Sequence, residues 1–480
     1  MSRKKLVTLG PMMWALLLCV LFIGTLNSLA AGFQVEPETP RIPTYFVPSQ
    51  VTIIGDSKEV NIVTSQVDGI SLRETIELGS PNQNSITVIG LYQISDTGTV
   101  TDTVQAINDK AVELSTMVVA EPNFFLAGAG LHISGSPGAP PVLDVAATNF
   151  SSQWTWEPEP GMQMITPSYT GQGIPVAVFD TSTFTEAQSY SPYPKTLANK
   201  SLQVWHLSDL TSPTSDALVP GHGYSVASLI DHIAPDADLH LFRVLNEHGI
   251  GDLFTLNKAI HRFISSRSGP GVINLSLGVL ADTDTITDIV TLKSVLLAAQ
   301  ERQFLTVAAA GNWSTIDASG NPLIGPTQYP AAFPFVLSVA ANNANGDRSC
   351  FSSPTNGVSA PGGNGAGTDC QPPTTCPPGQ CVTALDPTST GTGASGWIGS
   401  SFATSLVSGI AAVAWEKGQA NVTGGVTPEE VICAIELAAQ NAGDAHLGHG
   451  IANLPNTLNN IIPVANNNCL KLYFPLIAAP

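Results

Sequence analysis

The sequence predicts an α/β fold: a doubly wound, mostly parallel central sheet with helices on both faces, preceded by a small α+β domain. Two observations lead to this prediction. Beyond about residue 150, short apolar runs alternate with helical patterns, and strands that alternate with helices form parallel sheets covered on both sides. Residues 127–141, which are rich in Gly, Ser, Ala and Pro, separate these runs from an N-terminal unit with its own strand and helix patterns.

The elements of the larger domain follow from hydrophobic periodicity. Two helices are marked by a carboxylate followed by regularly spaced apolar residues, one beginning at Asp252 and the other at Asp288. Residues 361–400 are rich in Gly and Pro and contain three cysteines, so we expect a disulfide-pinned loop there. A later helix starts at a capping box formed by Thr427 and Glu430. The runs predicted as strands are 174–179, 239–244, 272–275, 304–309 and 336–340.

Residues 1–31 have the organisation of a secretory signal peptide. A basic segment, 2–5, is followed by an apolar run, 12–23, and by small residues up to Ala31. Twelve apolar residues fall short of the about 20 that span a bilayer, which favours a cleaved signal over a retained membrane anchor. We therefore expect a secreted, extracellular protein that does not contact the membrane once the signal is removed.

The remaining chain divides at the Gly- and Pro-rich stretch. Before it we expect a strand at 86–94, a helix carrying Val100, Val104 and Ile107, and a second strand at 112–120. The expected domains are the signal at 1–31, the α+β unit at 32–141, the larger domain at 142–462 and a C-terminal tail at 463–480.

Charge and cysteine content narrow the possible partners and compartment. The net charge is −19 with a pI of about 4.7, so nucleic acid and anionic membrane surfaces are excluded as expected partners. Six cysteines remain after the signal, an even number that predicts three disulfides among 15 possible pairings. They are Cys350, Cys370, Cys376, Cys381, Cys433 and Cys469, and no two of them have the spacing of a zinc knuckle.

Four chemistry-bearing side chains lie at strand ends and helix starts. Asp180 follows the first strand of the large domain and Asn312 the fourth. His222 stands between two glycines at the start of an apolar helix, and Ser401 begins another helix, where free N–H groups favour developing negative charge. Singly, each is also explained as a cap, a turn residue or a buried polar group. Together they supply an orienting acid, a base, an oxyanion donor and a nucleophile.

Five segments around these residues resemble the signature blocks of the subtilisin-like serine proteases, the subtilases. They occur in the order Asp, His, Ser that is typical of this family. The resemblance covers about residues 153–454. The segments are Val-Ala-Val-Phe-Asp-Thr at 176–181, His-Gly-x-x-Val-Ala-Ser at 222–228, Val-Ile-Asn-Leu-Ser-Leu-Gly at 272–278, Ala-Ala-Gly-Asn at 309–312 and Gly-Ser-Ser-Phe-Ala-Thr at 399–404.

The resemblance implies a subtilisin-like fold and a role for each of these residues. Ser401 would be the nucleophile of an acyl-enzyme mechanism, His222 its general base and Asp180 the group that orients His222. Asn312 would stand in the oxyanion hole. Small residues would border the primary specificity pocket, which we expect to admit an apolar side chain of a protein or peptide substrate. These substrate-binding residues are Ser276, Leu277, Gly278, Ala309, Ala310 and Gly311.

The N-terminal unit is similar to the inhibitory propeptides of the family through Glu121-Pro122-Asn123. This similarity implies that the protein's own propeptide assists folding and blocks the cleft until the chain is cut after Asn123. No cofactor is required for the chemistry. The connection after His222 is shorter than in relatives with a calcium loop there, which disfavours a calcium site at that position. Structural calcium elsewhere is left open.

Three departures from the family pattern, at Ser182, Tyr224-Ser225 and Ser405, remove no catalytic group. An α/β-hydrolase esterase is disfavoured because it needs Gly-x-Ser-x-Gly, whereas residue 403 is Ala, and because the residue order is reversed. A sedolisin-type peptidase would need Glu at 222 and Asp at 312. A catalytically silent, subtilisin-fold binding or surface protein stays open as the alternative.

Overall fold

A computed structural model describes the chain from residue 41 onward, with gaps. All of the described residues belong to one unit that begins at Thr39. The signal peptide, Ser182 and residues 468–480 of the expected tail lie outside them. The described residues are 41–42, 44–79, 86–95, 98–128, 143–144, 155, 168–181, 203–206, 219, 221–246, 248–267, 269–284, 286, 288–365, 370, 376–377, 379–385, 394–440 and 443–467.

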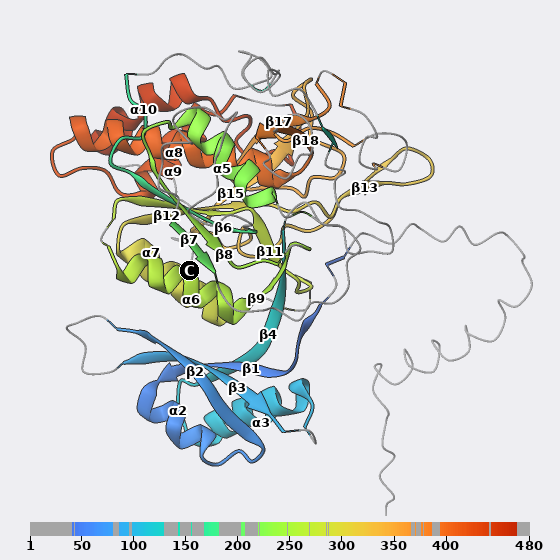
Figure 1. The fold of residues 1–480 in the computed structure, drawn as a ribbon, viewed down its shortest axis with the longest axis vertical. Coiled ribbons are helices and arrows are strands. Elements are labelled where there is room, and N and C mark those ends of the chain that lie inside the picture. Colours follow the sequence, from blue (N-terminus) through green and yellow to red (C-terminus); the bar gives the residue numbers. More distant parts are fainter. Residues whose placement is uncertain are drawn as a thin grey trace, which may run out of the picture. The chain divides into compact units, whose positions relative to one another are not determined.

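A seven-stranded parallel sheet is the centre of the larger domain (Figure 1). Its strands lie in the order β16-β15-β12-β10-β6-β8-β7. The order reverses between β6 and β10, and open parallel sheets bind ligands at the carboxyl ends of strands that flank such a reversal. The strands are β6 Pro175–Asp180, β7 Gln203–His206, β8 Asp238–Arg243, β10 Gly271–Leu275, β12 Phe304–Ala309, β15 Leu337–Asn342 and β16 Val358–Pro361.

Helices cover both faces of this sheet, as the sequence predicts. Alternate residues of β6 face opposite sides: Val176 and Val178 belong to one apolar core, and Ala177 and Phe179 to the other. The first core is closed by α5 His222–Ile233, α8 Ser400–Asn421, α9 Pro428–Ala438 and α10 Leu454–Asn467. The second is closed by α6 Leu253–Ser265 and α7 Val290–Glu301. Because α8 is buried from Ser400 through Trp415, it is the central helix of the domain.

The N-terminal unit is an antiparallel sheet with two helices and a core of its own. Its elements are β1 Phe46–Asp56, α2 Ser57–Thr64, β2 Ile70–Leu78, β3 Thr87–Ile94, α3 Val100–Glu113 and β4 Val119–Gly128. The strands lie in the order β4-β1-β3-β2. Beyond its pairing with β1, the end of β4, residues 125–128, pairs with two short strands of the larger domain, β9 Ile250–Asp252 on one side and β11 Leu277–Val279 on the other.

Four predicted boundaries need correction. The strand predicted at 112–120 starts only at Val119, because the apolar face of α3 continues to Ala111 and leaves Val112 78% exposed. The predicted linker begins after Gly128, since pairing with β9 and β11 extends β4. Helix α7 begins at Val290, because the Asp288 carboxylate binds Lys293 Nζ and caps no N–H. Finally, α10 continues across residue 463, where the tail was predicted to begin.

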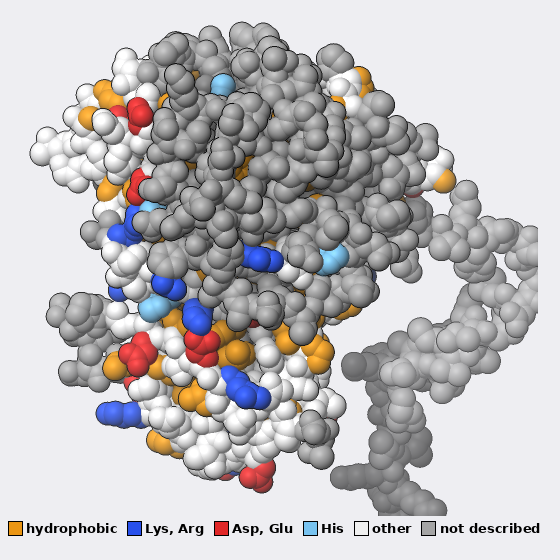
Figure 2. Space-filling model, viewed as in Figure 1, with side chains coloured by type: hydrophobic (Ala, Val, Ile, Leu, Met, Phe, Trp, Pro, Cys, Tyr) orange, Lys and Arg blue, Asp and Glu red, His pale blue; other side chains and the backbone are white. Residues whose placement is uncertain are grey.

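Short strands complete the described part of the chain. Three of them form a small sheet beside α5: β5 Leu143–Asp144, β17 Val382–Leu385 and β18 Ala394–Trp397. The hairpin of β13 Thr315–Ile316 and β14 Pro322–Leu323 follows β12. Among the described helices, none has the length and apolarity to cross a bilayer. In the view of Figure 2, positive and negative side chains are interspersed over the described surface.

Candidate active site

Asp180 and His222 form a buried hydrogen-bonded pair at the carboxyl edge of the sheet. Asp180 is the last residue of β6, and His222 is the first residue of α5. His222 Nδ1 lies 2.8 Å from Asp180 Oδ1 and 2.9 Å from Oδ2, and the two residues are 3% and 1% exposed. The carboxylate can only accept, so Nδ1 carries the shared proton and Nε2 is left as the basic nitrogen.

The glycine after His222 makes this approach possible. A Cβ on Gly223 would lie 2.1 Å from the carbonyl oxygen of Thr181 and 2.8 Å from Asp180 Cβ. Gly223 N also donates to Thr181 Oγ1 at 3.0 Å, which fixes the start of α5 against the end of β6. The His-Gly pair of the sequence is therefore a packing requirement of the Asp180–His222 contact.

The imidazole of His222 packs against a pair of aromatic side chains that are in contact with each other and to which the sequence did not point. Trp397 and Phe402 contact it edge to face, with ring centroids at 5.8 and 5.3 Å. Its Nε2 is buried and has no hydrogen-bond partner among the described residues. Because these rings restrict the imidazole, Nε2 has a fixed position, and no described residue competes for it.

Ser401 is the second residue of α8 and is fully buried. Its Oγ donates to the carbonyl of Ser276 at 3.1 Å, and Ser276 Oγ donates back to the carbonyl of Ser401 at 3.0 Å. In the described structure no hydrogen bond joins Ser401 Oγ to His222, although the next residue, Phe402, touches the imidazole. Catalytic hydrogen bonds are often absent without substrate and need only a rotation about the serine Cα–Cβ bond.

Asn312 lies against the start of α8. Its Oδ1 accepts from both the backbone N and the Oγ of Ser400, each at 3.0 Å. The N-cap of this helix, Gly399, has an extended glycine conformation with φ 148° and makes no side-chain cap. With Oδ1 engaged, Nδ2 is the atom of the Asn312 amide that can donate to an anion beside the helix N-terminus.

The six predicted substrate-binding residues are all buried and belong to two segments that follow β10 and β12. Ser276 is tied to Ser401 and to Asn274, whose Nδ2 in turn donates to Ser408 of α8. Leu277 and Gly278 lie in β11 and pair with Gly128 and Ala127 of β4. The structure thus brings the first segment beside Ser401 and places the N-terminal unit's last strand along it.

Comparisons with known proteins agree with this geometry. The model of the family described as "Subtilase family" matches residues 171–452, which is more than half of the chain. The chain belongs to the subtilase family. Its larger domain accordingly has the subtilisin-like α/β fold that the sequence predicts.

Two relatives and one solved structure illustrate the similarity of this subtilase to known proteins. Minor extracellular protease Epr of Bacillus subtilis is 32% identical over 228 residues, 45% of this chain and 31% of the relative. A thermostable alkaline protease of Halalkalibacterium halodurans is 33% identical over 155 residues, 30% of this chain and 38% of the relative. The chain thus spans about a third of the length of these curated relatives. Fervidolysin of Fervidobacterium pennivorans, described as a keratinolytic enzyme related to subtilisin, shares the fold with a TM-score of 0.56 at 18% identity, covering 90% of this chain and 65% of that one.

In this subtilase the N-terminal unit caps two helices of the larger domain. Glu121 accepts from Val290 N at 2.8 Å, from Thr291 N at 3.1 Å and from Thr291 Oγ1, at the uncapped start of α7. Asn123 Oδ1 accepts from Phe254 N at 3.0 Å at the start of α6. Burial raises the pKa of Glu121 to about 7, against the hydrogen bonds from Thr291 and Val290, which lower it.

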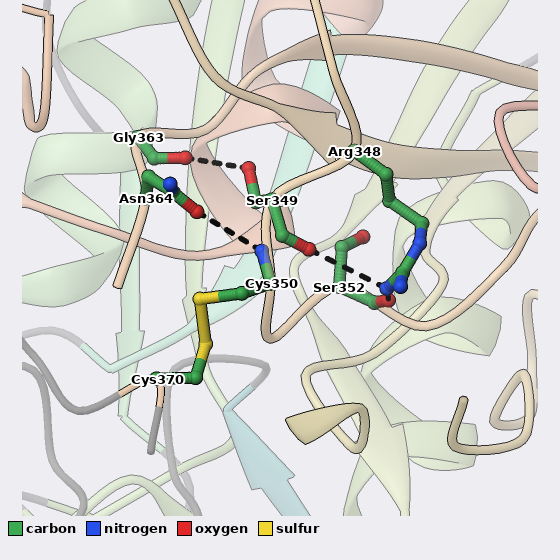
Figure 3. Close-up of a disulfide and its surroundings, with 7 residues drawn as sticks. All are labelled: Arg348, Ser349, Cys350, Ser352, Gly363, Asn364 and Cys370. Carbon is green, nitrogen blue, oxygen red and sulfur yellow. Dashed lines mark hydrogen bonds between the residues drawn. A yellow bond between two sulfur atoms is a disulfide. The ribbon is translucent and has the colours of Figure 1, made fainter. Parts of the chain in front are cut away.

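Disulfides fix the expected loop that leads to Ser401. Cys350 is bonded to Cys370, and Cys350 N donates to Asn364 Oδ1 at 3.0 Å (Figure 3). A second disulfide joins Cys376 and Cys381. Cys433 is also disulfide-bonded, to a partner outside the described residues. The structure therefore confirms disulfides in the loop, and no group of three or more metal-ligating residues occurs in the described part of the chain.

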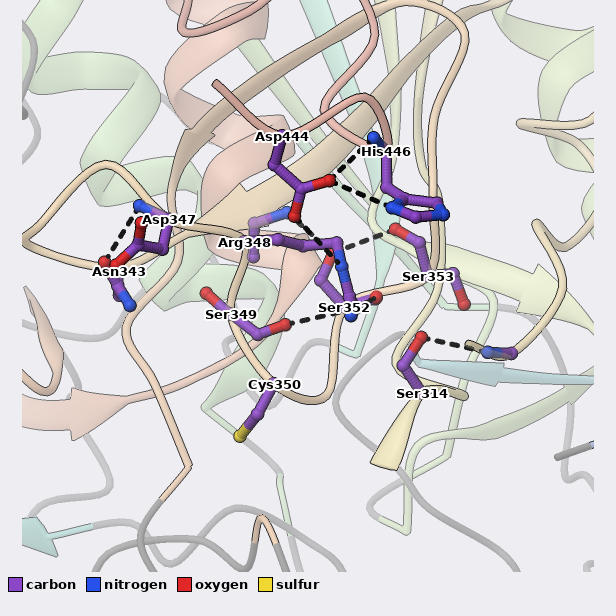
Figure 4. A network of polar contacts seen from close by, with 12 residues as sticks. Ser314, Asn343, Asp347, Arg348, Ser349, Cys350, Ser352, Ser353, Asp444 and His446 are labelled. Carbon is purple, nitrogen blue, oxygen red and sulfur yellow. Dashed lines mark hydrogen bonds and ion pairs between the residues drawn. The ribbon is translucent and has the colours of Figure 1, made fainter. Parts of the chain in front are cut away.

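A buried arginine holds the segment before that loop. Arg348 Nε lies 3.7 Å from Asp444 Oδ2, and its guanidinium also donates to the carbonyls of Ser349 and Ser352 (Figure 4). Asp444 in turn binds His446. The neighbouring Ser353 donates its N–H to the carbonyl of Gly311 at 2.9 Å. This network thus supports the second substrate-binding segment from behind.

Proposed function

We propose that this subtilase is a secreted serine endopeptidase in which Ser401 is the nucleophile, His222 the general base, Asp180 its orienting acid and Asn312 an oxyanion donor. The observation that carries the proposal is the buried Asp180–His222 pair, with its unpartnered Nε2, beside a helix N-terminus that presents Ser401. The family supports the same assignment.

The reaction follows from what each group can donate or accept. Ser401 Oγ leaves the Ser276 carbonyl, passes its proton to His222 Nε2 and attacks the peptide carbonyl carbon. The carbonyl oxygen becomes negative and accepts from the Ser401 backbone N–H and Asn312 Nδ2. His222 then gives its proton to the leaving amine, and water, deprotonated by His222, hydrolyses the acyl-enzyme. Removal of one oxyanion donor typically costs about 100- to 1,000-fold in turnover.

The test is covalent labelling of the processed protein with a fluorophosphonate. We expect a single adduct on the peptide that contains Ser401. Processed protein that stays unlabelled would overturn the peptidase proposal and favour the catalytically silent alternative.

The protein's own N-terminal unit would be its inhibitory propeptide and first substrate. In support of this, β4 lies between β9 and β11 as a substrate strand would, running antiparallel to β11 toward Ser276. Gly128, the last described residue of β4, is opposite Leu277, so Ser276 is one residue further along in this register, and Ala129 is the next residue of the sequence. Ser276 is the residue whose carbonyl binds Ser401 Oγ.

We therefore expect maturation to cut between Ala129 and Gly130, within the linker after Asn123 in which the sequence predicts the cut. Mass spectrometry of the mature N-terminus, taken at the earliest time of processing, measures this directly. Substituting Ala129→Asp should delay the first cut, since a carboxylate would lie beside the developing oxyanion. A first cut elsewhere, with normal processing of the Asp variant, would contradict the register.

Retention of the propeptide should depend on pH through Glu121. Its pKa is about 7 in the complex against an ordinary value of 4.5, so the complex holds a proton that the free propeptide loses between these values. The stabilisation is fully present below pH 4.5 and is lost as pH rises through 7. The dissociation constant, measured with fluorophosphonate-inactivated enzyme and its released propeptide, is expected to rise about 10- to 100-fold between about pH 5 and 7.

The matched variant is Glu121→Gln, which cannot ionise. It should bind more weakly in acid, since an amide offers one acceptor to the three donors at α7, but its affinity should be nearly independent of pH. A pH dependence equal to that of the wild type would assign the effect to another group.

A further inference from the structure

The side chain of Gln328 occupies the space between the two predicted substrate-binding segments. It is 3% exposed, and its backbone N–H donates to the carbonyl of Ala310 at 3.0 Å. A Cβ on Gly278 would lie 2.0 Å from Gln328 Cδ and 2.2 Å from Nε2, and a Cβ on Gly311 would lie 3.2 Å from Cδ. The amide therefore stands over both glycines, where their missing side chains leave room.

The orientation of this amide is fixed at one end only. Oε1 accepts from the indole Nε1 of Trp313 at 2.9 Å, and an indole nitrogen can only donate, which assigns the oxygen to that side. Nε2 is buried and has no hydrogen-bond partner in the described part of the chain. An unpaired N–H donor thus stands between the two segments, beside Gly278.

We propose that Gln328 makes the primary specificity pocket shallow and polar, so that this enzyme cleaves after short side chains, alanine, serine or glycine, and discriminates against large apolar ones. The inference rests on the proposed function, which places the substrate residue on the acyl side of the cut (P1) between these segments. It replaces the expectation of a pocket open to an apolar side chain.

Two physical effects act in the same direction. A Phe or Leu side chain must displace the amide and break its bond to Trp313, because the space over Gly278 and Gly311 is already filled. It must also cover Nε2 without offering an acceptor, which leaves a buried donor unsatisfied. A short P1 side chain requires neither change and leaves room for a water molecule that Nε2 can bind.

The chain's own expected cleavage segment has the same character. Residues 127–130 read Ala-Gly-Ala-Gly, so the cut that we expect after residue 129 has alanine at P1. A deep apolar pocket would gain nothing from this sequence, whereas a shallow one admits it.

The experiment compares tetrapeptide p-nitroanilides that differ only at P1, with Ala, Leu, Phe or Gln, using the mature enzyme. We expect kcat/KM for Ala to exceed that for Phe at least tenfold. Gln328→Gly should raise kcat/KM for Phe at least tenfold and change Ala little. Gln328→Met keeps the side-chain volume and removes the N–H donor, so kcat/KM should rise for the Leu substrate but stay low for the Phe substrate. Gln300→Met, on α7 and bonded to Glu429, is the control and should match the wild type.

The P1 preference of the wild-type enzyme tests the shallow pocket even if the variants fail to fold. A preference for Leu or Phe overturns the shallow pocket, and a preference for Gln overturns it in favour of recognition of long side chains by Nε2. If Ser401 is labelled by fluorophosphonate but no p-nitroanilide is cleaved, cleavage products of a denatured protein give the P1 preference instead. Absence of labelling refutes the proposed function, a result distinguishable from a wrong specificity.

Discussion

Replacing Ser401 by alanine is expected to reduce peptide hydrolysis by about a million-fold and to leave the precursor uncut. The loss in kcat has this magnitude when the nucleophile is removed from subtilisin, a member of the same family. The physical reason is that His222 Nε2 then has no hydroxyl to deprotonate, while the helix N-terminus and Asn312 can still polarise a carbonyl. The residual rate should therefore stay above that of the uncatalysed reaction.

The measurement must separate loss of chemistry from retention of the propeptide. Ser401→Ala precursor is first cut by a trace of wild-type enzyme, the wild type is inactivated with fluorophosphonate, and hydrolysis of the alanine substrate is then followed. Ser294→Ala is the control, because Ser294 Oγ only bonds the carbonyl of Val290 within α7. A Ser401→Ala protein that matures by itself and retains more than about a hundredth of the activity would exclude Ser401 as the nucleophile.

One observation keeps the catalytically silent alternative in view. Ser401 Oγ donates to Ser276 and not to His222 in this structure. However, the Ser276 carbonyl lies one residue beyond the last β4–β11 pair, Gly128 with Leu277, so a substrate strand bound along β11 would compete for it and release the hydroxyl. The Asp180–His222 pair is already formed, so the triad that we propose needs one further contact, from Ser401 Oγ to His222 Nε2.

Local signals in the sequence predicted the framework well. The N-cap at Asp252 is confirmed by its bond to Thr255 N at 3.0 Å, and the capping box of Thr427 and Glu430 is confirmed as well. Asp180, at a strand end, and His222, at a helix start, are 42 residues apart in the sequence but in contact in the structure. This agrees with the rule that the carboxyl ends of parallel strands, and the helices that follow them, meet at one edge of the sheet. These features depend on a few neighbouring residues or on one topological rule.

Features that depend on contacts between distant segments could not be predicted in this way. Asp288 was predicted to begin the second helix, yet the carboxylate at the start of α7 comes from Glu121, 169 residues before Val290. Gly128 was predicted in a linker because its strand partners, β9 and β11, lie far along the chain. Gln328 lies outside every segment that resembles the family, and its importance depends on the absence of side chains at Gly278 and Gly311.

Substituting Gly223 by alanine is expected to lower hydrolysis by at least about a thousand-fold, more than the loss of an oxyanion donor. The added Cβ would lie 2.1 Å from the Thr181 carbonyl, and neither backbone can yield without moving the end of β6 from the start of α5. That movement separates Asp180 from His222, so the imidazole loses the partner that fixes its tautomer and stabilises its charge. Processing of the precursor should fail for the same reason.

A matched substitution shows whether the effect comes from this contact. For processing of the precursor the control is Gly79→Ala, which adds the same methyl group where no atom lies within 4 Å and should fold and mature normally. For hydrolysis by the mature enzyme, from which residue 79 has been removed, the control is again Ser294→Ala. Gly223→Ala should keep its circular dichroism spectrum, because the clash is confined to the ends of two elements. The resonance of its His222 Nδ1–H proton should nonetheless move away from the position that a hydrogen bond to the Asp180 carboxylate gives it. If Gly223→Ala retains activity within about tenfold of the wild type, the close approach of α5 to β6 is not what holds the catalytic pair.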